Sequence, residues 1–447
     1  MRKLIAAIDL GTSKIVCIVG EQTEAGVKIV ALNEAPSKGI NRGEVVNIQS
    51  VLDSMMPTIT SVENAIGEKI NDVFVGISGQ HIKCIQETTQ ISRSNPDEYI
   101  TSGEIDEMTS QMKSNFTQNG EEVLLAIPQS YNIDDFMGIT EPVGMIGKQI
   151  FSNFKLFIGK KTSAELRRNA IARARLNIKG MILEPLASAK AVLDEEEKEV
   201  GVALLDIGSG TSDLIIIQDN IVRHAAIIPF GGNSITEDIK QGCGVSTKTA
   251  ERLKIERGAC MSSLAPDRTV RINGIGGRDN KDIPYKHLAE IIDSRIEEIL
   301  EAAMYEIEKS GYKEKIRGGM VITGGTSQLP NLTSLAHLVT GLDTRLAYPY
   351  RIFSEAETSI AKPSLSTATG LVLLGFEKME KEGGSYSSTS PASRKADVQT
   401  TSVSQEKEET KQTSQEQPKA PKKSPWGGFK GIIDSLKSDN VFKDNEA

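Results

Sequence analysis

The sequence predicts an α/β protein made of two related halves, followed by a tail of different composition. Two expected β-hairpins support this prediction. Each joins an apolar strand to a β-branched strand through a turn of glycine and hydroxyl residues headed by an aspartate, at residues 9–14 and 206–213. A third glycine segment, at 324–331, also follows an apolar strand. Apolar runs bounded by such turns predict strands, and their repetition predicts a duplicated domain.

The composition of these turns favours phosphate binding. Glycine lets backbone N–H groups approach a phosphate with no Cβ in the way, and hydroxyl side chains add donors. Asp9 and Asp206 stand at strand ends, where each can hold Mg²⁺ through water, and Asp213 is a further candidate in the second hairpin. One copy alone is more often an ordinary turn than a nucleotide site. Two facing copies predict a clamp around a triphosphate.

Composition limits the other possibilities. The chain has 447 residues, 38% of them hydrophobic, which is enough for two globular units. A net charge of −8 gives no support for nucleic-acid binding. The four cysteines and four histidines show no metal-ligand or disulfide spacing, which favours free thiols in a reducing compartment. We find no signal peptide and no apolar run approaching the ~20 residues of a membrane span, so a cytosolic origin is expected.

The pattern changes between the two hairpins. After a buried strand at 73–77, short strands at 123–127 and 154–158 and a polar helix at 102–115 predict a small α+β insert over residues 84–161. A helix at 162–176 is expected next, with Ser163 as its N-cap and its arginines, Arg167 among them, on the surface.

Further helices are expected at 247–258, 285–309 and 367–381. Glu184 stands just before a proline and a small-residue helix in the segment that joins the two halves. We interpret this segment as a hinge beside the active site.

The tail after residue 381 divides into two parts. Residues 382–424 are poor in apolar side chains and are predicted to be a disordered linker. An amphipathic helix is expected at 425–440, because five apolar side chains fall within an arc of roughly 120°. Five lysines against one aspartate between 419 and 437 favour an anionic membrane surface. A helix that docks on the protein's own body or in a partner's groove is the alternative. The predicted membrane-binding residues are Trp426, Phe429, Lys430, Ile432, Ile433 and Leu436.

These motifs together resemble the actin-like ATPase superfamily and, within it, the FtsA family of bacterial cell-division proteins. The resemblance covers residues 1–380 and the terminal helix, and its marks lie at 7–14, 75–82, 205–211 and 321–326. It implies an actin-like two-lobed fold of duplicated ribonuclease-H-like domains, with a small α+β insert in the first half, a disordered linker and a C-terminal amphipathic helix. Sugar kinases and DnaK-type chaperones share the hairpins but lack the insert together with this tail.

The resemblance also implies subdomain boundaries. These are subdomain 1A at 1–83, 162–197 and 366–381; subdomain 1C at 84–161; subdomain 2A at 198–233 and 310–365; and subdomain 2B at 234–309.

The function implied by the resemblance is that of an ATP-binding protein with Mg²⁺ and at most slow hydrolysis. It would polymerise into filaments and bind the C-terminal peptide of FtsZ, in subdomain 2B. Its terminal helix would anchor FtsZ filaments peripherally to the cytoplasmic face of the cell membrane at the division septum, where it would recruit later division proteins.

The expected site residues have separate roles. Asp9 and Asp206 would hold the metal, and Glu184 and Asp206 would be catalytic, although Glu184 at a helix N-terminus is also explained by the helix dipole. Glu251 and Lys254 match the family's ribose and base contacts. The remaining expected nucleotide contacts are Gly11, Thr12, Ser13, Lys14, Gly208, Ser209, Gly210, Thr211, Gly231, Gly232, Asn233, Gly324, Gly325, Thr326 and Gln328.

Two other functions remain open at this point. A small-molecule kinase of the same superfamily would need a general-base aspartate in an acceptor pocket, for which we find no separate candidate. The other is an actin-like scaffold such as a pilus-assembly platform.

Overall fold

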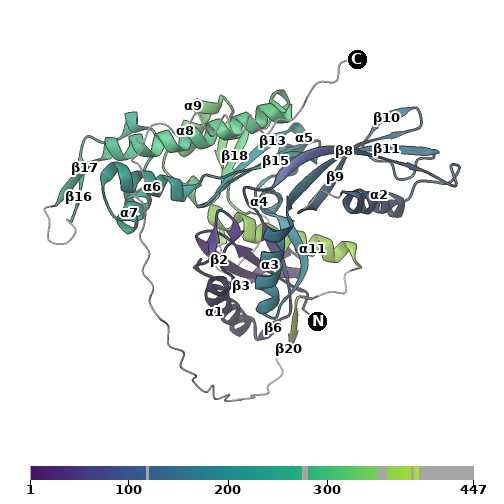
Figure 1. Cartoon of the computed structure of the whole chain (residues 1–447), viewed down its shortest axis with the longest axis horizontal. Helices are drawn as coiled ribbons and strands as arrows, with labels where there is room; N and C mark the ends of the chain where they lie inside the picture. The colour runs from purple at the N-terminus through teal and green to yellow at the C-terminus, as the bar shows by residue number, and fades with distance from the viewer. Residues whose placement is uncertain (1, 117–119, 274–279, 351–359, 384–386, 392–447) are drawn as a thin grey trace, which may run out of the picture. The chain divides into compact units, whose positions relative to one another are not determined.

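The computed structural model describes residues 2–116, 120–273, 280–350, 360–383 and 387–391 (Figure 1). The chain divides into two compact units, Met1–Ser393 and Arg394–Ala447, and every described residue belongs to the first. The predicted membrane helix at 425–440 and linker residues 392–424 lie outside the described residues. Among the described residues, no helix is long and apolar enough to span a membrane.

The first five-stranded sheet has the order β12-β7-β1-β2-β3. Strand β1 pairs antiparallel with β2 and parallel with β7. Its alternate residues enter two different cores: Ile8 faces α1 and α3, whereas Ile5 and Ala7 face α11. A strand buried on both faces reads as a continuous apolar run. The strands are β1 (Leu4–Leu10), β2 (Lys14–Thr23), β3 (Gly26–Pro36), β7 (Asp72–Ile77) and β12 (Asn177–Leu183), and the helices are α1 (Ile48–Ile66), α3 (Lys161–Arg173) and α11 (Ser366–Lys381).

The second sheet repeats this topology with the order β15-β14-β13-β18-β19. Again the first hairpin strand pairs antiparallel with the second and parallel with a later strand. Helices α8 and α9 lie along this sheet in Figure 1. The duplicated fold expected from the two hairpins is therefore confirmed. The elements are β13 (Val202–Ile207), β14 (Ser212–Gln218), β15 (Ile221–Ile228), β18 (Met320–Thr323), β19 (Thr344–Leu346), α6 (Gly232–Cys243), α7 (Thr247–Arg257), α8 (Tyr285–Ser310) and α9 (Leu332–Thr340).

Helix α4 (Glu184–Val192) contacts both sheets and packs against α11. Helix α4 follows β12 of the first sheet and also contacts β13 and β14 of the second. The two helices cross closely, because a Cβ at Gly370 would lie only 1.7 Å from the carbonyl oxygen of Ala187. Only glycine allows this contact between backbones.

The insert forms its own sheet with the order β10-β9-β11-β8, and α2 packs against β9 and β8 (Figure 1). The expected helix is present, and Thr101 and Glu104 form its capping box. The expectation of short strands is wrong, because β9 and β11 have 13 and 12 residues. The elements are β8 (Lys83–Ser92), α2 (Ser102–Asn115), β9 (Glu121–Ile133), β10 (Phe136–Ile139) and β11 (Gln149–Lys160).

Three local expectations need correction. Ser163 is not an N-cap, because α3 starts at Lys161 directly after β11, and the Ser163 hydroxyl bonds Glu44 instead. Arg167 is buried rather than on the surface. The linker expected from residue 382 contains β20 (Thr389–Pro391), which pairs with β6 (Glu68–Ile70).

The remaining described elements are short. They are β4 (Ile40–Asn41), β5 (Glu44–Val45), β16 (Thr269–Ile272), β17 (Lys281–Pro284), α5 (Glu195–Val200), η1 (Ser262–Leu264), η3 (Lys313–Lys315), η4 (Thr326–Gln328) and η5 (Pro363–Leu365). The four cysteines are free thiols, and Cys84 alone among them is half-buried rather than buried.

Candidate functional site

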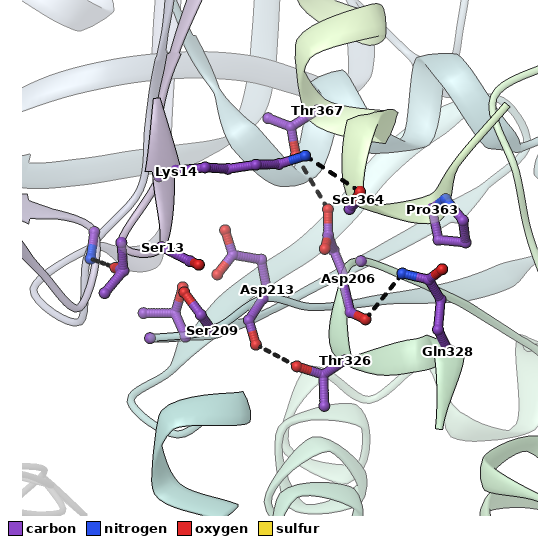
Figure 2. A pocket seen from close by; sticks show the side chains of 18 of the residues that line it. Ser13, Lys14, Asp206, Ser209, Asp213, Thr326, Gln328, Pro363, Ser364 and Thr367 are labelled. Carbon is purple, nitrogen blue, oxygen red and sulfur yellow. Dashed lines mark hydrogen bonds between the residues drawn. The ribbon is translucent and has the colours of Figure 1, made fainter. Parts of the chain in front are cut away.

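A cavity of about 580 Å³ lies where the two hairpin turns meet (Figure 2). Asp9 and Asp206 both line it, although they come from different sheets. The volume is in the range of small-molecule sites. The expected site residues that line it are Asp9, Gly11, Thr12, Ser13, Lys14, Glu184, Asp206, Gly208, Ser209, Gly210, Thr211, Glu251, Lys254, Gly324, Gly325, Thr326 and Gln328, together with Asp213.

The two turns approach each other closely at Thr12 and Gly210. A Cβ added to Gly210 would lie 2.5 Å from Thr12 Oγ1 and 2.9 Å from Thr12 Cβ. Both contacts are shorter than van der Waals separation, so a larger residue at 210 would push the turns apart. The glycine expected to admit a phosphate therefore also sets the spacing between the two turns.

Backbone hydrogen bonds support the second turn from behind. The N–H groups of Gly232 and Asn233 donate to the carbonyl oxygens of Gly208 at 2.9 Å and Ser209 at 2.7 Å. Thr326 Oγ1 donates to the Gly208 carbonyl at 2.9 Å. These hydrogen bonds fix the carbonyls of Gly208 and Ser209 relative to α6, and that of Gly208 also relative to η4.

The expected phosphate contacts at the start of α6 need correction for this reason. Gly231, Gly232 and Asn233 are not among the residues that line the cavity. The N–H groups of Gly232 and Asn233 already have acceptors within the protein. The N–H groups of Gly232 and Asn233 hold the turn in place and are not available as phosphate donors in this conformation.

Side-chain contacts, with one backbone hydrogen bond, support the first turn. The N–H of Ser37 donates to the Ser13 carbonyl at 2.9 Å. Lys14 Nζ donates to Glu34 Oε2 at 2.6 Å. It also donates to Ser364 Oγ at 3.2 Å (Figure 2). Thr12 Oγ1 accepts the N–H of Gly43 at 3.0 Å. Lys14 therefore lines the cavity, and Glu34 is its one carboxylate partner among the described residues, so its ammonium can also pair with a phosphate.

Two aspartates of the second hairpin have hydroxyl partners. Asp206 Oδ2 accepts from Ser188 Oγ at 2.6 Å and from Thr367 Oγ1 at 3.2 Å. Asp213 Oδ2 accepts from Ser78 Oγ at 2.7 Å, whereas its Oδ1 is buried with no hydrogen-bond partner. A buried carboxylate oxygen without a donor is costly and marks a position suited to a cation or a bound water.

Burial raises the pKa of four carboxylates in this cavity. For Asp9 burial raises the pKa to about 6, with Lys14 opposing and Asp206 adding to the shift. For Asp213 burial and then the neighbouring Asp206 raise the pKa to about 7. Burial also raises the pKa of Asp206, and it raises that of Glu184 well above its ordinary value although Arg167 opposes the shift. Like charges in a low-dielectric site favour binding of a cation.

These carboxylates suit magnesium bound with its ligand rather than an all-protein metal cage. No group of three or more histidine, cysteine, aspartate or glutamate side chains converges on one point in the described part of the chain. Mg²⁺ typically takes one or two carboxylates, several waters and phosphate oxygens. Asp9 and Asp206, together with the unpartnered oxygen of Asp213, fit that arrangement.

Helix α7 contributes a different wall. Lys254 Nζ is buried and donates to Gly232 O at 2.9 Å, Thr236 Oγ1 at 2.9 Å and Glu251 Oε2 at 2.8 Å. Its three hydrogens are thus used within the protein. Glu251 stays partly exposed on the wall, and Ile255 is 71% exposed beside it.

Sequence reasoning missed several cavity residues. Ile255 lines the cavity although nothing in the local sequence indicates it, and Leu329 and Pro330, from the third glycine segment, are further apolar lining residues. The other missed lining residues are Gly43, Pro363, Ser364 and Thr367. Arg167, which bonds Glu184 from behind, was also missed.

The fold defines the class of protein. The chain superposes with TM-score 0.58 on a chain of the PilM–PilN type IV pilus biogenesis complex, at 14% identity, covering 83% of this chain and 98% of that one. It superposes with TM-score 0.53 on MreB5 of Spiroplasma citri bound to ADP, at 14% identity and coverages of 86% and 99%. The fold is therefore actin-like.

Sequence comparison identifies the family. Residues 203–370 match the family model of "Cell division protein FtsA", and residues 79–158 match the SHS2 domain inserted in FtsA. The chain is 32% identical to cell division protein FtsA of Pseudomonas aeruginosa over 397 residues, covering 87% of this chain and 94% of that protein. It is 31% identical to FtsA of Escherichia coli K12, with coverages of 84% and 91%. The chain belongs to the FtsA family of cell-division proteins.

Family membership decides between the alternatives left open by the sequence. The kinase and the pilus platform share the fold, and the resemblance to the pilus complex at 14% identity reflects that fold alone. The chain is a division protein with an actin-like fold.

Proposed function

We propose that this protein binds MgATP in the cavity between the hairpin turns and uses it in tying FtsZ filaments to the cytoplasmic membrane during division. The observation that best supports nucleotide binding is the convergence of two glycine-hydroxyl turns and their aspartates on one cavity. MreB5 of Spiroplasma citri, which has the same fold, is bound to ADP in one structure and to AMPPNP in another.

The two turns would bind the phosphates from opposite sides. Gly11, Thr12 and Ser13 line the cavity from the first turn, and Gly208, Gly210 and Thr211 line it from the second. Their hydroxyls and free backbone N–H groups would donate to the phosphates, whereas the N–H of Gly208 already donates to the Thr211 carbonyl at 2.9 Å. Lys14 would exchange part of its contact with Glu34 for a phosphate oxygen. Asp9 and Asp206 would hold Mg²⁺ through water, and the metal would neutralise charge on the β- and γ-phosphates.

The adenosine would lie toward the second half. The residues that line that side are Gly324, Gly325, Thr326 and Gln328. The two glycines have no side chain, which leaves room for a ribose. Glu251 is positioned to accept hydrogen bonds from ribose hydroxyls, and Ile255 with Leu329 and Pro330 offers an apolar surface to the base.

Titration calorimetry tests this proposal directly. We expect saturable binding of ATP that requires Mg²⁺ and that weakens strongly in EDTA, since four buried carboxylates would otherwise face the phosphates. Binding of ATP with equal affinity with and without Mg²⁺ would contradict the metal assignment. Absence of any binding would contradict the nucleotide assignment.

Nucleotide would control assembly through the closely packed helices α4 and α11. ATP bound to both turns favours a conformation in which the two halves are closed, and we propose that this conformation polymerises. Hydrolysis would be slow, with Glu184 orienting the attacking water and Asp206 acting through the metal. Polymerisation on lipid to the same extent without nucleotide would contradict the coupling.

Membrane attachment is proposed for the amphipathic segment at 425–440. Its apolar side chains and lysines suit an anionic bilayer surface. Replacing Trp426 and Phe429 with Glu should abolish co-sedimentation with anionic vesicles and leave MgATP affinity unchanged. Undiminished lipid binding would transfer the anchoring role to another segment.

The partner assignments rest on family membership. We propose that the C-terminal peptide of FtsZ binds subdomain 2B and that the protein recruits later division proteins at the septum. Pull-down with an immobilised FtsZ C-terminal peptide, against a scrambled peptide, tests the first of these.

A further inference from the structure

Arg167 is a buried cation behind the cavity wall. Its side chain is 2% exposed. The guanidinium donates to the carbonyl oxygen of Gly43 at 2.6 Å, to the carbonyl oxygen of Gly76, and to Glu184 Oε1 at 3.2 Å. These acceptors come from the β4–β5 turn, from β7 and from α4. A planar guanidinium can serve three such acceptors at fixed angles, whereas a lysine ammonium cannot reproduce that geometry.

The carbonyl of Gly43 connects this cation to the first phosphate turn. The N–H of the same residue donates to Thr12 Oγ1 at 3.0 Å, so the β4–β5 turn touches Arg167 on one side and Thr12 on the other. Gly43 adopts φ +76°, and a Cβ there would lie 3.3 Å from the backbone nitrogen of Gly79. The turn is therefore packed tightly and offers little freedom to the guanidinium.

Glu184 is the only acidic partner of Arg167 in the part of the chain that the structure describes. Gly76 makes room for it, because a Cβ at that position would lie 2.8 Å from Glu184 Cγ. Burial raises the pKa of Glu184 and the positive charge of Arg167 opposes that rise. An uncompensated carboxylate would be unfavourable at this depth.

Helix α3 holds the same turn at a second place. Ser163 Oγ donates to Glu44 Oε2 at 3.2 Å, and Glu44 Oε1 lies 3.0 Å from Nδ1 of the buried His81. The helix starts at Lys161, directly after β11 of the inserted sheet. Helix α3, which carries Arg167, is therefore joined to the inserted sheet at its start and bonded to Glu44 through Ser163.

We propose that Arg167 is a positioning residue for ATP hydrolysis: its guanidinium, fixed by the Gly43 and Gly76 carbonyls, holds the Glu184 carboxylate in place relative to the first phosphate turn. The inference rests on the proposed function, since it requires MgATP in the cavity. In hydrolysis the water oxygen bonds to the γ-phosphorus as the bond to the β–γ bridging oxygen breaks. ADP keeps that oxygen, and Glu184 accepts one water proton and releases it to solvent.

The test compares Arg167→Lys, Glu184→Gln and the double variant with the wild-type chain. Arg168→Lys is the matched control, because Arg168 is the next residue on α3, is 44% exposed and pairs with Glu122 away from the cavity. Calorimetry gives the Kd for MgATP, and single-turnover hydrolysis with excess protein gives the chemical rate even when turnover is slow.

We expect Arg167→Lys and Glu184→Gln each to lower the single-turnover rate at least about tenfold, because a positioned proton acceptor contributes on the order of 10²–10⁴-fold, with Kd within about threefold. The double variant should be no slower than the slower single variant, because Arg167 acts through Glu184. Arg168→Lys should match the wild type.

Several results would overturn the inference. A wild-type chain that binds MgATP and never hydrolyses it would contradict this inference alone, whereas one that does not bind MgATP would contradict the proposed function. Arg167→Lys at the wild-type rate, additive losses in the double variant, or equal losses in rate and affinity would assign Arg167 a purely structural role. Should Arg167→Lys fail to fold, Glu184→Gln decides: an unchanged rate overturns the inference, and a tenfold loss at unchanged Kd supports it.

Discussion

The two phosphate turns share a sequence pattern but are supported in different ways. Backbone donors from α6 and a hydroxyl from η4 hold the carbonyls of the second turn, and hydroxyl groups hold Asp206. The first turn has one such backbone donor, the N–H of Ser37 to the Ser13 carbonyl, and otherwise depends on side chains: Lys14 paired with Glu34, and Thr12 bonded to Gly43. No side-chain hydrogen bond to Asp9 forms among the described residues, whereas Asp206 has two.

The second turn is therefore a preformed wall of the cavity, and the first turn is an adjustable one. Backbone donors from α6 and the Thr326 hydroxyl from η4 fix the second turn before any ligand binds. A lysine with one carboxylate partner can turn toward a phosphate at low cost, because its stem has several rotatable bonds. We therefore expect ligand binding to change the first turn more than the second.

Adding a methyl group between the turns should have the largest effect. Alanine at Gly210 would place its Cβ 2.5 Å from Thr12 Oγ1. Overpacking of this kind costs about 2 kcal/mol, so we expect Gly210→Ala to weaken MgATP binding roughly thirtyfold in calorimetry.

Gly103→Ala is the matched control for that substitution. Gly103 lies in α2, outside the cavity, and has its nearest foreign atom 3.8 Å from an added Cβ. Its Kd should stay within about threefold of the wild-type value. Equal losses for both variants would mean that the turns do not need this close approach.

Removing the charge of the first turn should have the next largest effect. Replacing Lys14 with Met removes one charge-assisted hydrogen bond, so the Kd for MgATP should rise about tenfold. Binding of adenosine should not change, because Lys14 is placed to meet phosphate. Lys38→Met, at an exposed lysine outside the cavity, is the control. A matching loss of adenosine affinity would contradict the assignment of Lys14 to phosphate.

The smallest effect is a pH-dependent change in stability. Burial raises the pKa of Asp213 to about 7 in the folded chain, above its unfolded value. The stabilising contribution of the protonated group is complete below the unfolded value and is lost as pH rises through about 7. The side chain of Asp213→Asn stays neutral at every pH and keeps this contribution. The thermal midpoint of the nucleotide-free variant, measured relative to that of the wild type, should therefore rise between pH 5 and pH 8 by up to a few degrees.

Asp97→Asn, at an exposed aspartate, is the control for this pH series. Its difference from the wild type should not depend on pH. A difference between Asp213→Asn and the wild type that is equally large at pH 5 and pH 8 would show that ionisation of Asp213 does not affect stability. Measurements in EDTA exclude metal binding as the cause.

Much of the site could be predicted from the sequence because the hairpin turns are local features. Strand, turn and strand lie within about twenty residues, and glycine and aspartate mark the turn whatever surrounds it. The wrong predictions concern residues whose role depends on contacts with segments that are distant in the sequence. The N-terminus of α6 has the local features of a phosphate site. However, its N–H groups donate to the carbonyls of the second turn, and strands β14 and β15 separate that turn from α6 in the sequence. The sequence alone does not show that these donors are already used.

Arg167 shows a signal that was present and misinterpreted. The buried residues of α3 are Ala164, Arg167, Ala170 and Ile171, which follow helical spacing. An arginine on the apolar face of a helix is exceptional and needs a buried partner. Only the spatial neighbours, Glu184 among them, explain why it lies there.

The most direct test of the two-turn account is calorimetric titration of MgATP into Asp9→Asn, Asp206→Asn and the wild-type chain under the same conditions. The account predicts that both substitutions, one in each sheet, weaken binding by at least about tenfold, because each aspartate contributes to one shared metal. Wild-type affinity in either variant would mean that only one turn meets the metal and nucleotide, and would contradict the account.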